Sequence, residues 1–499
     1  MDIRVTTQAV NDVASDVLIV TATRPSGDQK GISLSSAATT VDQALGGVIV
    51  DCGTSGEFKG NAGEILTIHT LGKLAPRRVL VVGLGSANKV MPQSLRKLGA
   101  SIVRHMRSTG AQSATLTHDD TLDITEAAQA LTEGLLLGAY TFRKYQRSTN
   151  ENTQLEAVQF LASERNKVAV EQGIQKGKAL ADATNFARDL VNEPPNVLTP
   201  TELANRASAM AREFGLECEV FDKAKIEELK MGGLLGVTQG SAQPPRFVIL
   251  RYRGAPESTE PGLALVGKGI TFDTGGISLK PAASMETMKS DMGGAAAVIG
   301  AMQAIAALKP KVNVTGFVPT CENMPSGTAY RPGDILRILN GKTIEIVNTD
   351  AEGRLILADA LSYASQEGYS PIIDLATLTG GIVVALGNVM SGLFSNDDGL
   401  QQQIIEAGHA AGEKFWPMPL DEEYGDLVKS DVADVKQTGG RGASSVTAAK
   451  ILEHFVSDAK WAHLDIAGTA FTESPKNMEK GGTGFGVRTL AELALSRAQ

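Results

Sequence analysis

The second half of the chain alternates short apolar runs with longer helical patterns, and this alternation restricts the possible folds more than any other feature. The runs occupy residues 247–252, 263–266, 312–318, 343–347, 372–376 and 461–466, and most are rich in β-branched residues. Such runs are typical of strands buried on both faces of a sheet. We therefore predict an α/β fold with an open mixed sheet sandwiched between helices, and ligands at the carboxyl ends of the strands.

The first part of the chain follows the same alternation. Strands are predicted at residues 17–21, 47–51 and 78–83, and helices at 95–107 and 124–139. A long polar helix is expected over 164–190, and it must end before Pro194-Pro195 because proline does not continue a helix. A chain of 499 residues is too long for one core. We predict an N-terminal α/β domain at 1–165, a linking helix at 166–192 and a second domain at 193–499.

Composition excludes several classes of protein. The net charge of -9 disfavours nucleic acid as the main partner, because phosphate binding needs a basic face. Three scattered cysteines suggest neither a disulfide framework nor a thiolate zinc site: Cys52, Cys218 and Cys321. Residues 1–4 lack an apolar signal core, and the longest low-charge stretch, 372–394, contains an aspartate and four glycines. We expect a cytoplasmic protein without a membrane span.

Charged residues gather where the predicted strands end. Residues 267–280 follow the run at 263–266, and the octapeptide NTDAEGRL at 348–355 follows the run at 343–347. Asp291 precedes an alanine-rich helix at 295–308. All these segments can converge on one edge of the sheet, as can residues 377–381.

Each charged group also has a purely structural explanation. Thr349 and Glu352 match a helix capping box, and Asp291 could cap its own helix. The combination is harder to explain in this way: Asp273, Asp291, Asp350 and Glu352 with Lys268, Lys280 and Arg354. Four carboxylates at one strand edge repel one another unless cations neutralise them. Three basic side chains could do so, and two divalent metal ions would do so while leaving the bases free.

Several kinds of active site do not fit the sequence. The chain has no HExxH motif, and all six histidines lie outside residues 268–354, so a mononuclear zinc protease of that type is excluded. No G-x-S-x-G elbow supports a serine hydrolase. Oxygen-rich ligation suits Mn²⁺, Mg²⁺ or Zn²⁺, and two such ions about 3.5 Å apart produce a hydroxide nucleophile near neutral pH.

A dinucleotide-binding oxidoreductase is a weaker alternative. Gly83-Leu84-Gly85 follows a predicted strand, as in a dinucleotide fingerprint, but Asn88 stands where a third glycine or an alanine is required. A glycine turn after a buried strand explains the same residues.

The motifs together resemble the leucyl (cytosol) aminopeptidase family of dinuclear metallopeptidases. The match rests on NTDAEGRL, on VGKGITFDTGGISLKP at 266–281 and on SDMGGAA at 290–296, with DLATLTGG, NEPPN and WAHLDIAG. It is close over about residues 185–490, whereas the first 165 residues match only in general character. The resemblance implies a catalytic metallopeptidase domain at 193–499. It also implies that the protein releases N-terminal residues, preferring leucine and other apolar residues, in peptide turnover.

The resemblance assigns roles residue by residue. Its metal ligands fall on Lys268, Asp273, Asp291, Asp350 and Glu352, and its catalytic groups on Lys280 and Arg354. In the family, two ions (Mn²⁺ or Zn²⁺) are bridged by the residues matching Asp273 and Glu352. Lys280 would stabilise the oxyanion, and Arg354 would hold a bicarbonate that shuttles a proton. Substrate contacts fall on Met288, Thr377, Leu378 and Gly380.

The family also implies partners. Substrates are peptides with a free N-terminus, whose α-amine would ligate one metal ion. Assembly is expected to be a homohexamer whose active sites face an inner cavity. A DNA-binding regulatory protein of the same fold is the alternative, because some bacterial relatives bind DNA. The acidic balance and the intact ligand set argue against that alternative.

Overall fold

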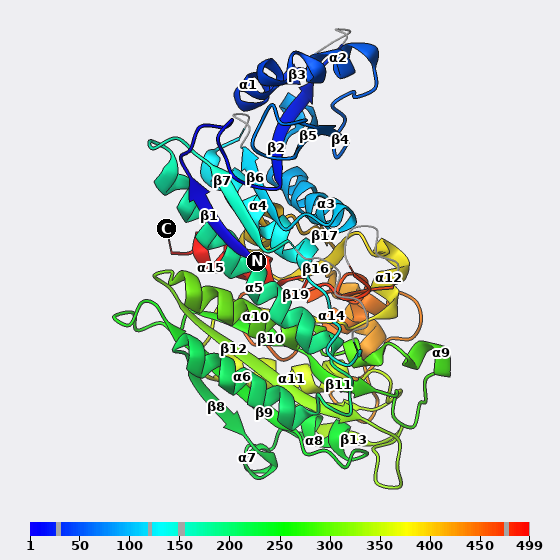
Figure 1. Cartoon of the computed structure of the whole chain (residues 1–499). Coiled ribbons are helices and arrows are strands. Elements are labelled where there is room, and N and C mark those ends of the chain that lie inside the picture. The colour runs from blue at the N-terminus through cyan, green and yellow to red at the C-terminus, as the bar shows by residue number, and fades with distance from the viewer. Residues whose placement is uncertain (26–30, 118–121, 148–154, 474–478, 499) are drawn as a thin grey trace. The chain divides into compact units, whose positions relative to one another are not determined.

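The computed structural model describes residues 1–25, 31–117, 122–147, 155–473 and 479–498 (Figure 1). The chain separates into two compact units: Met1–Asp182 with Pro475–Glu479, and Ala183–Ser474 with Lys480–Gln499. The division falls inside helix α5 (Lys167–Asn192), which covers the segment predicted as a linking helix. The domain limits at residues 165 and 193 stay predictions.

The described part of the first unit is built on one mixed sheet in the order β1-β7-β6-β2-β5-β4, with β3 beside β2. The strands are β1 (Asp2–Thr6), β2 (Val17–Arg24), β3 (Ser33–Leu34), β4 (Ile65–His69), β5 (Arg78–Ser86), β6 (Ser113–Thr117) and β7 (Ala157–Leu161). The helices are α1 (Ser36–Leu45), α2 (Val48–Ser55), η1 (Ala87–Lys89), α3 (Pro92–Thr109) and α4 (Ile124–Ala139). Alternate residues of β2 and β5 enter two separate cores, which explains why both strands are apolar throughout.

The strand predicted at residues 47–51 is wrong, because this segment forms the first turn of α2. Gly46, with a φ of 85°, ends α1, and Gly47, with a φ of 89°, turns the chain into α2. The carboxylate of Asp42 accepts the backbone N–H of Ile49 at 2.7 Å and fixes the new helix there. This contact with the preceding helix therefore outweighs the strand preference of the Val-Ile-Val run.

The second unit contains a nine-stranded mixed sheet among the described residues, in the order β17-β16-β19-β15-β10-β12-β9-β8, with β11 beside β12. Its strands are β8 (Glu217–Phe221), β9 (Arg246–Arg253), β10 (Leu263–Gly267), β11 (Gly269–Asp273), β12 (Asn313–Asn323), β15 (Ile372–Ala376), β16 (Ser391–Ser395), β17 (Phe415–Pro417) and β19 (Trp461–Asp465). The central strands β19, β15, β10 and β12 are parallel, so their carboxyl ends share one edge. Two short strands, β20 (Phe471–Thr472) and β21 (Gly481–Gly482), pair separately.

Helices cover both faces of this sheet. Beyond α5, the helices in the described part of this unit are α6 (Pro200–Phe214), α7 (Lys223–Glu228), α8 (Gly232–Thr238), α9 (Ala282–Met285), η2 (Met288–Ser290), α10 (Gly293–Leu308), α11 (Gly353–Gln366), α12 (Gly380–Leu386), α13 (Asp398–Ala411), η3 (Glu422–Val428), α14 (Ser444–Glu453) and α15 (Val487–Ser496). Helices α8, α11 and α14 share one hydrophobic core with the sheet, and α10 packs on β10, β12 and β15 together with α6 and α15. The predicted α/β fold with a helix-covered mixed sheet is confirmed.

The stretch Ala282–Leu308 is apolar and long enough to cross a membrane, but 89% of its most apolar window is buried inside the protein. A helix that is apolar on all sides is typical of a core position as well as of a membrane span. Gly294 shows how tightly α10 packs, because a Cβ there would lie 2.0 Å from the carbonyl oxygen of Leu375.

The run at 343–347 does form a strand, β14 (Thr343–Glu345), but outside the main sheet. It joins a small sheet with β13 (Ile335–Arg337) and β18 (Val435–Lys436). Its inclusion in the main sheet was therefore wrong. A three-residue strand carries too few side chains for the sequence to indicate which partner it pairs with.

One buried carboxylate connects two of these helices with the turn between β13 and β14. Asp359 of α11 is fully buried, and its two oxygens accept the backbone N–H groups of Leu234 in α8 at 2.8 Å and of Leu339 at 2.9 Å. Because both oxygens accept, an amide in this place would set one N–H donor against another.

We therefore expect Asp359→Asn to lower the free energy of unfolding by about 1–3 kcal/mol, the usual cost of a buried group without its partner. Urea denaturation would measure the change. The matched control is Asp431→Asn at an exposed position, which should stay within about 0.5 kcal/mol of wild type. Equal stability of the Asp359 variant and this control would contradict the proposed connection.

Candidate active site

The octapeptide connects β14 to α11 and includes the first three residues of α11, and its Thr349 side chain bonds to the glycine turn that follows β11. The hydroxyl of Thr349 donates to the carbonyl of Gly275 at 2.6 Å and accepts the N–H of Ser278 at 2.8 Å. Gly276 has a φ of 64°, and a Cβ there would lie 2.9 Å from the Thr349 hydroxyl. The predicted capping box is wrong, because Thr349 bonds to this turn and Glu352 makes no side-chain cap bond.

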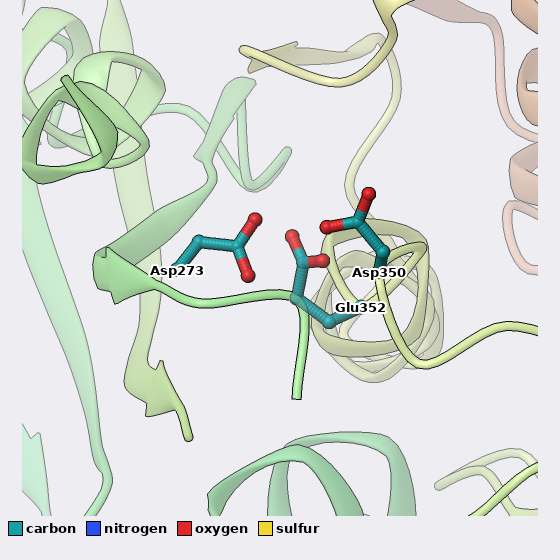
Figure 2. Close-up of side chains that lie close together, drawn as sticks. All are labelled: Asp273, Asp350 and Glu352. Carbon is teal, nitrogen blue, oxygen red and sulfur yellow. The ribbon is translucent and has the colours of Figure 1, made fainter. Parts of the chain in front are cut away.

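Three of the predicted acidic ligands meet at this point. Oxygen atoms of Asp273, Asp350 and Glu352 all lie within 4.8 Å of one another. Figure 2 shows the three carboxylates pointing toward a common space, with Asp273 at the end of β11 and the other two beside the start of α11. Residues far apart in the sequence are thus brought together as predicted.

The fourth acid, Asp291, joins the group through a lysine. Lys268 Nζ lies 2.8 Å from an oxygen of Asp291 and 2.8 Å from Glu352 Oε1. Asp291 does not cap α10, whose N-cap residue is Met292 without a side-chain cap bond. The alternative role of Asp291 as a helix cap is therefore wrong.

A second lysine joins the other two acids. Lys280 Nζ lies 2.8 Å from Asp273 Oδ2 and also forms an ion pair with Asp350. Each lysine therefore links two carboxylates that belong to different segments. With four carboxylates and two ammonium groups all ionised, the cluster carries a net charge of -2.

Burial makes this excess charge costly. It raises the pKa of Asp291, Asp273 and Asp350, and the charge of Glu352 raises the first two further. Burial alone would lower the pKa of Lys268, but the surrounding carboxylates outweigh it and raise that pKa. The local environment therefore favours additional positive charge.

The donor set fits divalent metal ions. Within the described residues, Glu352 Oε2 is buried and has no hydrogen-bond partner. Carboxylate oxygens at this density, with one amine nitrogen, are ligands suited to hard and borderline dications. The residues that could hold a metal centre are Lys268, Asp273, Asp291, Asp350 and Glu352.

The cluster forms one side of a cavity of about 440 Å³. The lining includes all five predicted ligands, Lys280 and the four predicted substrate contacts Met288, Thr377, Leu378 and Gly380. Apolar side chains complete it: Leu279, Pro281, Val383, Ala467 and Phe471. The cavity thus combines a charged side, where chemistry is possible, with an apolar wall suited to a hydrocarbon side chain.

Arg354 is the one predicted site residue outside the cavity lining. Its guanidinium is buried, and one terminal nitrogen donates to the carbonyl of Gln437 at 2.8 Å. Its Nε is buried and lacks a hydrogen-bond partner in the part of the chain that the structure describes. Burial lowers the pKa of Arg354 to about 10, so the side chain is charged at neutral pH.

Several supporting residues were not predicted. Asn323 donates to Asp273 Oδ1 at 2.9 Å and to the carbonyl of Thr349 at 3.0 Å, and Tyr330 donates to the same carbonyl at 2.7 Å. Gln437 accepts the N–H of Asn348 at 3.1 Å. No local pattern identifies these residues, because their partners lie at least nineteen positions away.

Comparisons with known proteins identify relatives across the whole chain. Residues 185–491 match the cytosol aminopeptidase family catalytic domain, and residues 18–149 match the N-terminal domain of that family. Probable cytosol aminopeptidases of Alkaliphilus metalliredigens and Alkaliphilus oremlandii are 45% and 46% identical, with 99% of each chain covered.

Two solved structures also resemble this one. A bottromycin maturation enzyme in complex with Mn has a TM-score of 0.83 and 36% identity, over 97% of this chain and 100% of that one. A tomato leucine aminopeptidase mutant has a TM-score of 0.88 and 35% identity, over 99% of this chain and 96% of that one.

The hydrogen bonds of Asn323 generate a prediction about metal affinity. Asn323→Leu removes both bonds that orient Asp273 and Thr349, and we expect it to weaken Mn²⁺ binding by about 10- to 100-fold. Titration calorimetry would measure this.

The opposite end of β12 offers a matched control. Asn313 also makes two side-chain hydrogen bonds, both to the backbone of Ala255, so Asn313→Leu loses the same number of bonds. It should leave Mn²⁺ affinity unchanged. Similar affinities for the two variants would contradict a specific role of Asn323 at the metal centre.

Proposed function

Because the chain belongs to the cytosol aminopeptidase family, we propose that its cavity hydrolyses N-terminal peptide bonds with two divalent metal ions, Mn²⁺ or Zn²⁺. The predicted family is confirmed, and the protein is a metal-dependent leucyl aminopeptidase that acts on peptides. The observation that carries the two-ion assignment is the cluster of four carboxylates, which retains negative charge after pairing with two lysines.

In this proposal Asp273 and Glu352 would help to hold both ions, Asp350 would hold one ion, and Lys268 and Asp291 would hold the other. When bound, the ions supply a water that is deprotonated near neutral pH and polarise the scissile carbonyl. Lys268 must release its proton to coordinate, since an ammonium group has no lone pair.

Lys280 provides the charge that stabilises the transition state. Its amine reaches the cavity from the segment after the glycine turn. Burial alone would lower the pKa of Lys280, but Asp273 and Glu352 outweigh it and raise that pKa. Lys280 therefore stays protonated at neutral pH and donates hydrogen bonds to the oxyanion that develops on the substrate.

Arg354 is the proposed binding residue for bicarbonate, which would supply a group able to accept and release a proton during hydrolysis. The support is a buried guanidinium whose Nε has no partner among the described residues. A planar oxyanion matches the fork of a guanidinium, and the permanent charge of arginine prevents it from acting as the base itself.

The apolar wall sets the substrate preference. Met288, Thr377, Leu378 and Gly380 would contact the first residue, whose α-amine ligates a metal ion. One methylene changes binding in such a pocket by only about 1–3 kcal/mol, so the preference for leucine is broad and extends to methionine.

We further propose a cytoplasmic homohexamer, on the strength of the family membership and of the relatives' names. None of the comparisons reported above supports DNA binding, and the net charge of -9 disfavours it.

The dinucleotide alternative is wrong, because β5 continues to Ser86 instead of opening a helix at Gly83. A Cβ on Gly83 would lie 2.2 Å from the carbonyl oxygen of Asn61, which explains this glycine.

The deciding test is hydrolysis of leucine p-nitroanilide with and without Mn²⁺. We expect chelation to abolish activity and Mn²⁺ to restore it. Asp350→Ala removes a ligand and Lys280→Ala removes the oxyanion partner, and each should lower kcat/KM by about 100-fold or more. Asp431→Ala, at an exposed position, is the control with normal activity. Metal-independent cleavage, or full activity of Asp350→Ala, would overturn the two-metal mechanism.

Bicarbonate requires a separate test. In buffer freed of carbon dioxide, added bicarbonate should raise wild-type kcat, whereas Arg354→Met should not respond because the anion has lost its binding residue. Arg246→Met changes a partly exposed arginine whose guanidinium bonds to the carbonyl of Pro245, and it should respond like wild type. An equal response of all three proteins would exclude Arg354 as the bicarbonate site.

A further inference from the structure

A single buried carboxylate accepts hydrogen bonds from two segments that line the cavity. Asp465, at the end of β19, accepts the N–H groups of Leu378 at 3.1 Å and Ala467 at 3.2 Å through Oδ1. Its Oδ2 accepts the hydroxyl of Thr379 at 2.6 Å. These three partners line the cavity, whereas Asp465 itself is fully buried.

We propose that Asp465 is the positioning residue of the substrate pocket. It holds the loop of residues 377–380, the substrate loop, in place. The loop then lies at the distance from the metal ligands that recognition of the first side chain of the substrate requires. This inference rests on the proposed function. Asp465 touches neither substrate nor metal ligand in it, and it acts through Leu378, Thr379 and Ala467.

The other end of the loop is bound to the ligand cluster. The carbonyl of Thr377 accepts a hydrogen bond from Lys268 Nζ at 3.0 Å, and its hydroxyl donates to Asp291 Oδ1 at 2.7 Å. The loop is therefore hydrogen-bonded to Lys268 and Asp291 at one end and to Asp465 at the other. Loss of the Asp465 bonds would free the apolar wall while leaving the bonds to the ligands in place.

Thr379 also connects Asp465 to helix α12. It is the N-cap residue of that helix, and its hydroxyl accepts the N–H of Ile382 at 3.1 Å while donating to Asp465. Val383, in the first turn of α12, also lines the cavity. One hydroxyl thus transmits the position of Asp465 to a further part of the apolar wall.

Asp465 belongs to a group of buried polar side chains on β19 and β15. Trp461, His463 and Asp465 alternate along β19 and therefore lie on one face of the strand. Asp374, opposite His463 on β15, lies 2.6 Å from His463 Nδ1 and accepts the Trp461 indole N–H at 2.7 Å. Burial would lower the pKa of His463, but Asp374 outweighs it and raises that pKa. Burial raises the pKa of Asp465, and the neighbouring His463 acts in the opposite direction.

Hydrogen exchange of the protein without added metal tests the positioning role directly. In Asp465→Ala, the amides of residues 378–382 should exchange about 10-fold faster or more, while those of α8 stay as in wild type. Asp359→Asn is the matched control, because Asp359 is also a fully buried carboxylate with two backbone N–H partners. It should show the reverse pattern.

Kinetics with leucine and alanine p-nitroanilides provide the second readout. Asp465→Ala should raise KM for the leucine substrate about 10-fold and lower the leucine-to-alanine ratio of kcat/KM, with Mn²⁺ affinity unchanged. Thr379→Val, which lacks the hydroxyl, should behave in the same way, and Thr379→Ser should remain near wild type. The serine and valine pair decides the question even if Asp465→Ala does not fold.

Three results would overturn the proposal. One is unchanged exchange of residues 378–382 in Asp465→Ala or, should that variant not fold, in Thr379→Val. Another is an equal shift of KM in Asp359→Asn, and the third is equal kinetics of Thr379→Ser and Thr379→Val. A wild-type protein that cleaves neither substrate would instead refute the proposed function, and hydrogen exchange would still decide whether Asp465 holds the loop.

Discussion

The central constraint in this protein is the mutual repulsion of four acidic side chains that meet at one edge of a sheet. Asp273, Asp291, Asp350 and Glu352 come from three separate segments, and each is at least partly removed from water. Parallel strands bring their carboxyl ends to one edge, so the fold itself causes this repulsion. Lys268 and Lys280 reduce the repulsion, because each forms ion pairs with carboxylates of two segments.

The backbone around this cluster is held by hydrogen bonds of polar side chains that do not belong to the cluster. Thr349 binds the octapeptide to the glycine turn, and Asn323 binds the same octapeptide to Asp273. Asp465 does the corresponding work for the substrate loop. Buried neutral hydrogen bonds therefore set the positions of Asp273 and the octapeptide, and one remote carboxylate sets the position of the loop of residues 377–380. The supporting partners matter as much as the residues that they hold.

The sequence predicted what depends on local pattern and missed what depends on tertiary pairing. The helix at 124–139 and the strand at 372–376 have the predicted limits, since their periodicity and flanking residues agree with their environment. The strand predicted at 47–51 failed because Asp42, from the preceding helix, captures the N–H of Ile49. The cluster of acids was visible in the motifs, but Asn323 was not, because its partners Asp273 and Thr349 are 50 and 26 residues away.

The lysine that bridges Asp291 and Glu352 also limits how a metal ion enters. Lys268 Nζ lies 2.8 Å from a carboxylate on each side and 3.0 Å from the carbonyl of Thr377, so its donors are directed at the atoms that surround the centre. An amine coordinates a cation only after losing its proton. A dication held by Lys268 would therefore displace a proton, and the bond to Thr377 would break or be redirected. Thr377 also begins the loop of residues 377–380, so this rearrangement would be confined to the end of the loop beside Lys268. The bonds of Asp465 to Leu378 and Thr379 would keep the rest of the loop, and with it the apolar wall, in place.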